Sequence, residues 1–213
     1  MSKEPDVVKV IDRINQELPA GAWPAWPGGW KNNIEAAALD SVFSIRARYG
    51  SETTGVRAVV NNWRQHRGTG SDDLGALAEF VGKEEQLLEI LQNRQRLGSG
   101  SSKAAAAALA AQALLDAGVR SSGDLKGTAD QRRAWCSVPG LAKVTWSYFQ
   151  MLLGVQGVKA DVMVVRFVAD ALGKTSVPSE EARELVLAAA ERMNVGATDL
   201  DHAIWSWQRK QRR

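Results

Sequence analysis

Apolar side chains recur three and four positions apart in nearly every segment between the Gly, Pro and Ser residues that punctuate the chain. This spacing is typical of amphipathic helices that bury one face against each other. No segment shows the alternation of a strand, so we expect an all-α protein. The pattern predicts helices over residues 7–18, 33–48, 53–66, 72–81, 83–94, 103–117, 129–136, 143–153, 161–172, 178–194 and 199–211.

Proline and glycine residues define the connections between these helices. Pro24 and Pro27, with the glycines that follow, make residues 20–30 a rigid, irregular loop. Residues 97–102 form a soft connector, and Gly118 ends the alanine-rich helix after it.

Composition allows one domain, or one domain built from two helical lobes, because 213 residues with 45% hydrophobic side chains can bury a proper core. The formal net charge is +3. The Arg-rich end at 209–213 leans only weakly toward a polyanionic partner.

The few metal-binding and thiol side chains exclude several classes of protein. A single cysteine, Cys136, excludes an internal disulfide and any cluster held by several cysteines. His66 and His202 are too far apart for metal-ligand spacing, so we expect neither a metal nor a cofactor. The first residues lack the apolar core of a signal peptide, and no apolar run reaches membrane-spanning length. We therefore expect a reduced, cytoplasmic protein with no membrane partner.

The most informative segment runs from Val138 to Thr145 with the sequence Val-Pro-Gly-Leu-Ala-Lys-Val-Thr, between two helical patterns. A Pro-Gly pair before a helix gives a tight turn whose first backbone N–H groups point outward, a natural cradle for a phosphate oxygen. Lys143 adds positive charge beside it. Taken alone, the pattern favours an ordinary structural turn, because such turns are common.

The next segment changes this interpretation. The helix after the turn ends at Gly154, and a loop then places Asp161 at the start of another helix, with Arg166 five residues beyond. This order resembles the helix-hairpin-helix (HhH-GPD) DNA glycosylase superfamily, which contains endonuclease III, the adenine glycosylase of mismatch repair and bacterial alkyladenine glycosylases. In that family a Leu-Pro-Gly-x-Gly hairpin opens a helix and a loop delivers an aspartate. The resemblance is specific over about 138–168 and faint elsewhere.

The resemblance implies a two-lobed helical glycosylase fold with a cleft between the lobes. One lobe would span 33–153, with the hairpin at 138–145, and the other would combine 1–32 with 154–213. Arg46 ends a segment similar to the family's early helix, which meets the gap left by a flipped base. The implied DNA-binding residues are Pro139, Gly140, Leu141, Ala142, Lys143, Thr145, Arg46 and Arg166.

The family's chemistry explains the need for a carboxylate such as Asp161. Breaking the bond between a base and C1′ builds positive charge on the sugar, so a fixed anion lowers the barrier and can orient the attacking water. The alternative is that Asp161 is a simple N-cap. The hairpin and Arg166 favour the catalytic interpretation, and one residue can do both.

Two departures from the family pattern affect what can be expected. Ala142 replaces the second hairpin glycine, which restricts the backbone there. If Thr145 is matched to the family's threonine, Val144 occupies the position of the Schiff-base lysine, which favours a monofunctional enzyme without strand cleavage. A gap inside the hairpin would instead place Lys143 there and make the enzyme bifunctional. The missing cysteines also remove the family's iron–sulfur cluster.

A flipped base needs flat groups to stack on, and Trp23, Trp26 and Trp30 can form such a wall. The alternative is that they fasten the first helix to the core. His202, Trp205 and Trp207 on the last predicted helix favour neither a pocket nor the core.

We therefore expect a monomeric, monofunctional DNA glycosylase that excises a damaged or modified base and leaves an abasic site. It would serve base repair or antiviral defence against modified phage DNA, such as DNA with glucosylated hydroxymethylcytosine. The alternatives are a non-catalytic helix-hairpin-helix DNA-binding module and a helical adaptor that binds another protein through the Trp-rich loop.

Overall fold

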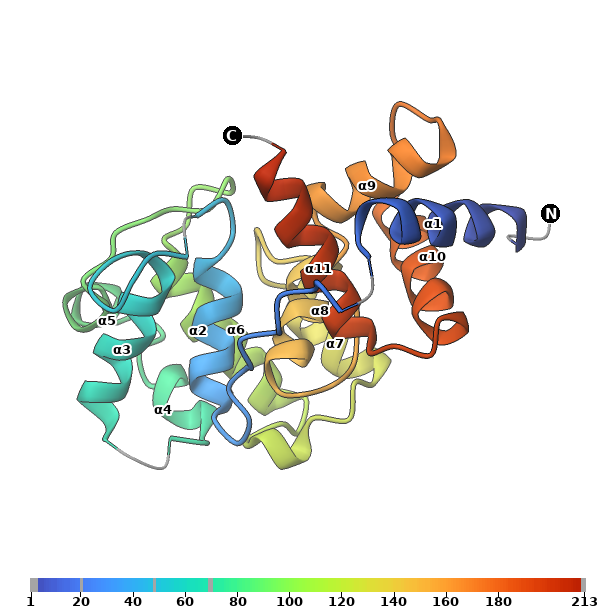
Figure 1. Cartoon of the computed structure of the whole chain (residues 1–213). Helices are drawn as coiled ribbons and strands as arrows, with labels where there is room; N and C mark the ends of the chain where they lie inside the picture. The colour runs from blue at the N-terminus through green and yellow to red at the C-terminus, as the bar shows by residue number, and fades with distance from the viewer. Residues whose placement is uncertain (1–3, 20, 48, 69–70, 212–213) are drawn as a thin grey trace. The chain divides into compact units, whose positions relative to one another are not determined.

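The computed structural model describes residues 4–19, 21–47, 49–68 and 71–211 (Figure 1). These residues form α-helices and one short 3-10 helix without any strand, which confirms the predicted all-α class. The helices are α1 (Glu4–Glu17), α2 (Ile34–Phe43), α3 (Gly55–Arg67), α4 (Leu74–Ala78), α5 (Glu84–Leu91), α6 (Lys103–Asp116), α7 (Ala129–Cys136), α8 (Lys143–Leu152), α9 (Val162–Leu172), α10 (Ser179–Arg192) and α11 (Ala197–Lys210). In the described part of the chain, no helix has both the length and the apolar character needed to cross a bilayer.

The chain divides into two compact units. One unit spans residues 29–154 and contains α2 to α8, and the other combines residues 1–28 with 155–213 and contains α1, α9, α10 and α11. In the second unit α1 lies beside α9 and α10, and α9 packs on α11 (Figure 1). The buried core of this unit is aliphatic except for Phe167, which is fully buried.

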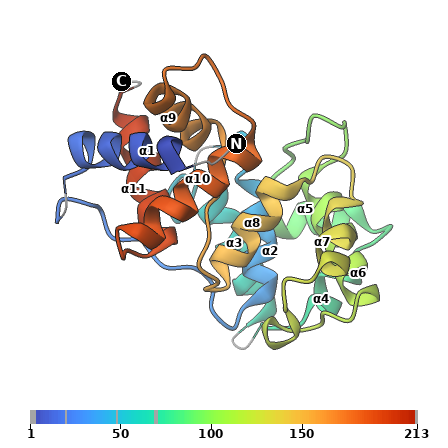
Figure 2. The same ribbon diagram turned by 90° about the vertical axis from the view of Figure 1, so that its right-hand side faces the viewer.

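Helix α2 is the centre of the larger unit. All ten of its residues are buried, and it contacts α3, α4, α6 and α8 (Figure 2). A helix surrounded on every side is mostly apolar or small, which explains the run Ala36–Ala38, and its buried Glu35 and Asp40 accept hydrogen bonds within the protein. The alanine side chains of α6 are small, so this helix can lie close to both α2 and α4.

Helix α2 ends at Phe43, five residues before the predicted end at residue 48. The buried ammonium group of Lys103 donates to the carbonyl oxygens of Phe43 at 2.8 Å and Ile45 at 2.7 Å. These carbonyls are thereby satisfied without another helical turn. Arg46 follows with a φ of +48°, a left-handed conformation that ends the helix.

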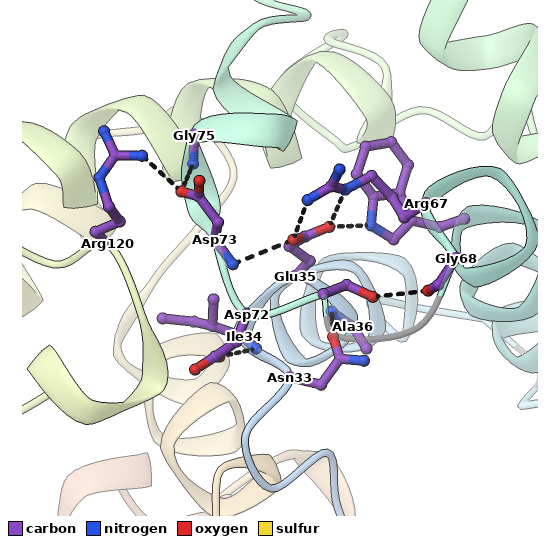
Figure 3. A network of polar contacts seen from close by, with 12 residues as sticks. Asn33, Ile34, Glu35, Ala36, Arg67, Gly68, Asp72, Asp73, Gly75 and Arg120 are labelled. Atoms are coloured by element: carbon purple, nitrogen blue, oxygen red, sulfur yellow. Dashed lines mark hydrogen bonds and ion pairs between the residues drawn. The ribbon is translucent and has the colours of Figure 1, made fainter.

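The N-terminus of α2 is fixed by a buried polar network (Figure 3). The side chain of Glu35 is fully buried, and it accepts hydrogen bonds from Trp63 Nε1 at 2.7 Å and Arg67 Nε at 3.0 Å. It also accepts from the backbone N–H of Asp73 at 3.1 Å. The network joins α2, α3 and the start of α4. Because donors of the protein itself bond to the Glu35 carboxylate, we assign the network a structural function.

Candidate nucleic-acid interface and carboxylate site

The predicted hairpin is a turn between α7 and α8. The N–H of Leu141 donates to the Val138 carbonyl at 3.0 Å, and Gly140 has a φ of +94°. A Cβ atom on Gly140 would lie 2.8 Å from Leu97 Cδ1, which is the end of a flexible side chain. The positive φ, rather than the space, is therefore what favours glycine here. Pro139 and Gly140 are exposed, whereas the side chain of Leu141 is buried.

The buried side chain of Thr145 stabilises the turn through hydrogen bonds. Its Oγ1 accepts from Trp135 Nε1 and from the Ala142 N–H, both at 3.0 Å, and donates to the Ala142 carbonyl at 2.7 Å. The threonine side chain is therefore occupied within the protein. Ala142 has an extended conformation with a φ of −146°, so this position does not require glycine.

The first turn of α8 holds backbone donors that have no acceptor within the described part of the chain. Among the described residues, the N–H groups of Val144 and Thr145 donate to no acceptor. The side chains of Ala142 and Lys143 beside them are exposed. Unpaired N–H groups at the N-terminus of a ten-residue helix, next to a lysine, can bind an anionic oxygen.

Asp161 lies at the N-cap of α9. Its Oδ1 accepts from the N–H groups of Met163 at 2.8 Å and Val164 at 3.4 Å. No donor in the described part of the chain bonds to its Oδ2, and the side chain is half-buried. The aspartate therefore caps the helix through one of its two carboxylate oxygens.

Asp201, on α11, lies near Asp161 and is not among the sequence-predicted site residues. It is 5% exposed, and its Oδ1 accepts from the Lys159 N–H at 2.9 Å. Burial raises the pKa of Asp201 well above its ordinary value, and the negative charge of Asp161 raises it further. The signal in the sequence is weak, because one aspartate on an amphipathic helix ordinarily faces solvent.

The three tryptophans of the predicted base pocket have different neighbours. Trp23 donates from Nε1 to the Leu18 carbonyl at 2.8 Å and packs on the core of the smaller unit. Trp26 meets His202 edge to face, with ring centroids 5.4 Å apart. Trp30 donates from Nε1 to Asp40 at 2.9 Å in the larger unit. Trp23 and Trp30 thus anchor the two ends of the loop.

A row of flat groups follows one side of α11. The rings of His202 and Trp205 are nearly parallel at 6.1 Å, and the guanidinium of Arg209 lies 5.2 Å from the centre of the Trp205 ring. These rings are half-buried. Burial lowers the pKa of His202, which favours a neutral imidazole near pH 7.

The predicted arginine contacts are at the surface. Arg46 is exposed in the turn after α2, and Arg166 is exposed on α9. Arg209 belongs to the described part of the C-terminal basic run, while Arg212 and Arg213 lie outside the described residues.

Buried Asp40 ties the second helix of the hairpin to the centre of the larger unit. Its carboxylate accepts from Trp30 Nε1 at 2.9 Å, Tyr49 Oη at 2.8 Å and Tyr148 Oη at 3.3 Å. Tyr148 belongs to α8. Burial, and then the charge of Asp40, raises the pKa of Tyr49, so this phenol stays protonated and keeps donating.

Lys103 gives a pH-dependent prediction. Burial lowers its pKa from 10.5 to about 8, although three oxygen acceptors favour the charged form. Unfolded lysine binds its proton up to about pH 10.5, so between these values the unfolded state holds more protons. The free energy of unfolding therefore rises with pH in this window, by at most about 1.4 kcal/mol per pH unit.

Urea unfolding at pH 7.5 and pH 9.5 checks this prediction. The wild-type protein should gain stability relative to Lys103→Met at the higher pH, because the variant lacks the titrating group. An equal stability difference at the two pH values would contradict a lowered pKa.

Comparisons with known proteins give a family but no activity. A search among curated proteins found no match to the chain, and a search among solved structures found none. The sequence profile of DUF8548, a domain of unknown function, matches residues 8–209, so the chain belongs to this family.

Proposed function

We propose that this protein is a DNA glycosylase that uses the α7–α8 hairpin to hold a phosphate and Asp161 to cleave the bond between a base and its sugar. The observation that carries the proposal is the Asp161 carboxylate, which is fixed at a helix N-terminus with one oxygen engaged and the other not.

The hairpin supplies the binding energy that does not depend on base sequence. The N–H groups of Val144 and Thr145 would donate to one phosphate oxygen, and Lys143 would add a positive charge beside it. The locked geometry of Thr145 supports this assignment, because a pre-formed cradle loses little entropy when it binds.

The chemistry assigned to Asp161 is hydrolysis. The C1′–N bond breaks, and its electron pair leaves with the base. Water adds its oxygen to C1′ and passes a proton to the carboxylate, while the departing base takes a proton from solvent. The anion also stabilises the positive charge that develops on the sugar in the transition state.

A monofunctional reaction is the form that the residues favour. Lys143 is the first residue of α8 and directly precedes the two residues whose N–H groups form the proposed phosphate cradle. We therefore assign the positive charge of Lys143 to phosphate binding and not to a covalent bond with the sugar. Borohydride trapping of a covalent protein–DNA adduct would reassign Lys143 as a nucleophile.

The test of the proposed function measures free bases. The purified chain is incubated with genomic DNA from several bacteria and phages and with alkylated and oxidised DNA, and released bases are identified by mass spectrometry. The proposal expects one base or a small set, with abasic sites in equal number. Tight DNA binding without base release would instead support a non-catalytic binding module, in which Asp161 is only a cap.

The hairpin assignment predicts a specific salt dependence. Lys143→Gln should weaken DNA binding for every sequence, and the slope of log affinity against log salt should fall by about 1, because one fewer counterion is released. Fluorescence anisotropy with a labelled duplex at several salt concentrations measures this slope. Lys9→Gln, which removes a charge from α1, is the control and should keep the wild-type slope. An unchanged slope for Lys143→Gln would remove the lysine from the interface.

A further inference from the structure

The loop that delivers Asp161 is attached to α11. The Asp201 Oδ1 atom accepts from the backbone N–H of Lys159 at 2.9 Å. The N–H of Asp161 donates to the carbonyl of Lys159 at 2.6 Å, which makes a tight turn that ends at the N-cap of α9. Only one residue separates the anchored N–H from Asp161, so Asp201 restrains the backbone that carries its carboxylate.

A second attachment holds the earlier part of the loop. Thr198 is 4% exposed, and its Oγ1 accepts from the Gly157 N–H at 3.1 Å. The Thr198 N–H donates to the side-chain oxygen of Gln156 at 3.1 Å. The first two turns of α11 therefore support the loop at separate points, of which Asp201 is the nearer to Asp161.

The charges around Asp201 determine its protonation. The negative charge of Asp161 and burial both favour the neutral carboxylic acid, while the charge of Lys159 and its N–H favour the anion. No group of α1 or α10, among the residues described, contributes to this balance. Burial is the largest effect and raises the pKa of Asp201, so Asp201 stays protonated over a range in which free aspartate is ionised.

We infer that Asp201 is a positioning residue for Asp161, because its Oδ1 fixes the backbone of Lys159 in the loop that carries the Asp161 carboxylate. This inference rests on the proposed glycosylase function. A neutral carboxyl group at this position supports the loop without placing a second negative charge beside the first. Once Asp201 ionises, repulsion between the two carboxylates displaces Asp161, so the excision rate falls toward alkaline pH.

Three variants test the inference by single-turnover base excision between pH 5 and pH 9. Asp201→Ala removes the acceptor for Lys159 and should slow excision by about 10- to 100-fold, since a displacement near 1 Å has an effect of this size. Asp201→Asn keeps an acceptor and cannot ionise, so its rate near pH 6 should match wild type while the alkaline decline disappears. Asp199→Asn, at an exposed position of the same helix, is the matched control and should keep the wild-type profile.

Two measurements test the interaction of Asp201 with Lys159 and Asp161 without relying on enzyme activity. Amide exchange at Lys159 should become faster in Asp201→Ala and stay slow in Asp201→Asn, while Gly157, held by Thr198, stays protected in both. The carboxyl carbon of Asp201, followed by nuclear magnetic resonance, should titrate at lower pH in Asp161→Asn than in wild type, because a neighbouring negative charge has been removed.

The outcomes separate the inference from the proposed function. If wild type releases no base but Lys159 exchange and the Asp201 titration change as expected, the glycosylase proposal fails and the pairing stands. If wild type excises a base and both Asp201 variants keep its rate and pH profile, the positioning assignment is wrong. A titration of Asp201 that does not respond to Asp161→Asn would also overturn it.

Discussion

Asp161→Asn should lower the rate of base excision by about 10²- to 10⁴-fold, the usual contribution of a carboxylate that assists proton transfer and stabilises developing charge. Asparagine caps a helix about as well as aspartate, so the bonds to the Met163 and Val164 N–H groups can persist. The variant therefore separates the cap from the chemistry. The measurement is the single-turnover release of the base identified for wild type.

Two further variants make this result decisive. Asp170→Asn changes an exposed carboxylate on the same helix and should retain wild-type excision. Asp161→Ala should lose both excision and the cap, with a decrease of about 1 kcal/mol in the free energy of unfolding. Wild-type excision by Asp161→Asn would show that Asp161 is only a cap.

Glu35→Gln should destabilise the larger unit by about 1 to 3 kcal/mol, the usual cost of a buried donor left without its acceptor. The carboxylate is fully buried and accepts from Trp63, Arg67 and the Asp73 N–H, so an amide cannot satisfy all of these donors. The Arg67 side chain is about a third exposed, so water can still solvate its charge. The cost therefore comes mainly from a buried N–H donor, on Trp63 or Asp73, that loses its acceptor. Urea unfolding followed by circular dichroism gives the change in free energy.

An exposed glutamate in the same unit provides the comparison. Glu79 lies directly after α4 and is exposed, so Glu79→Gln should change stability by less than about 0.5 kcal/mol. Equal effects of the two substitutions would show that the network in Figure 3 contributes little to the fold.

The sequence by itself determined the helices. Each predicted helix is present in the structure, because the spacing of apolar residues and the Gly and Pro stops act over a few residues at a time. It also determined the turn at Gly140, whose left-handed conformation is a local property. The cap at Asp161 follows from the same local logic.

The tertiary structure decided which charged side chains are buried and which backbone groups they bond to. Asp201 and Lys159 are 42 positions apart, and Lys103 and Ile45 are 58 apart, so no local pattern pairs them. The premature end of α2 at Phe43 is a result of the second pairing. Burial changes the protonation of such groups, and it is created only when distant helices pack. The predicted helices therefore place Asp161 at a helix start, while the packing of α11 determines how that carboxylate is held.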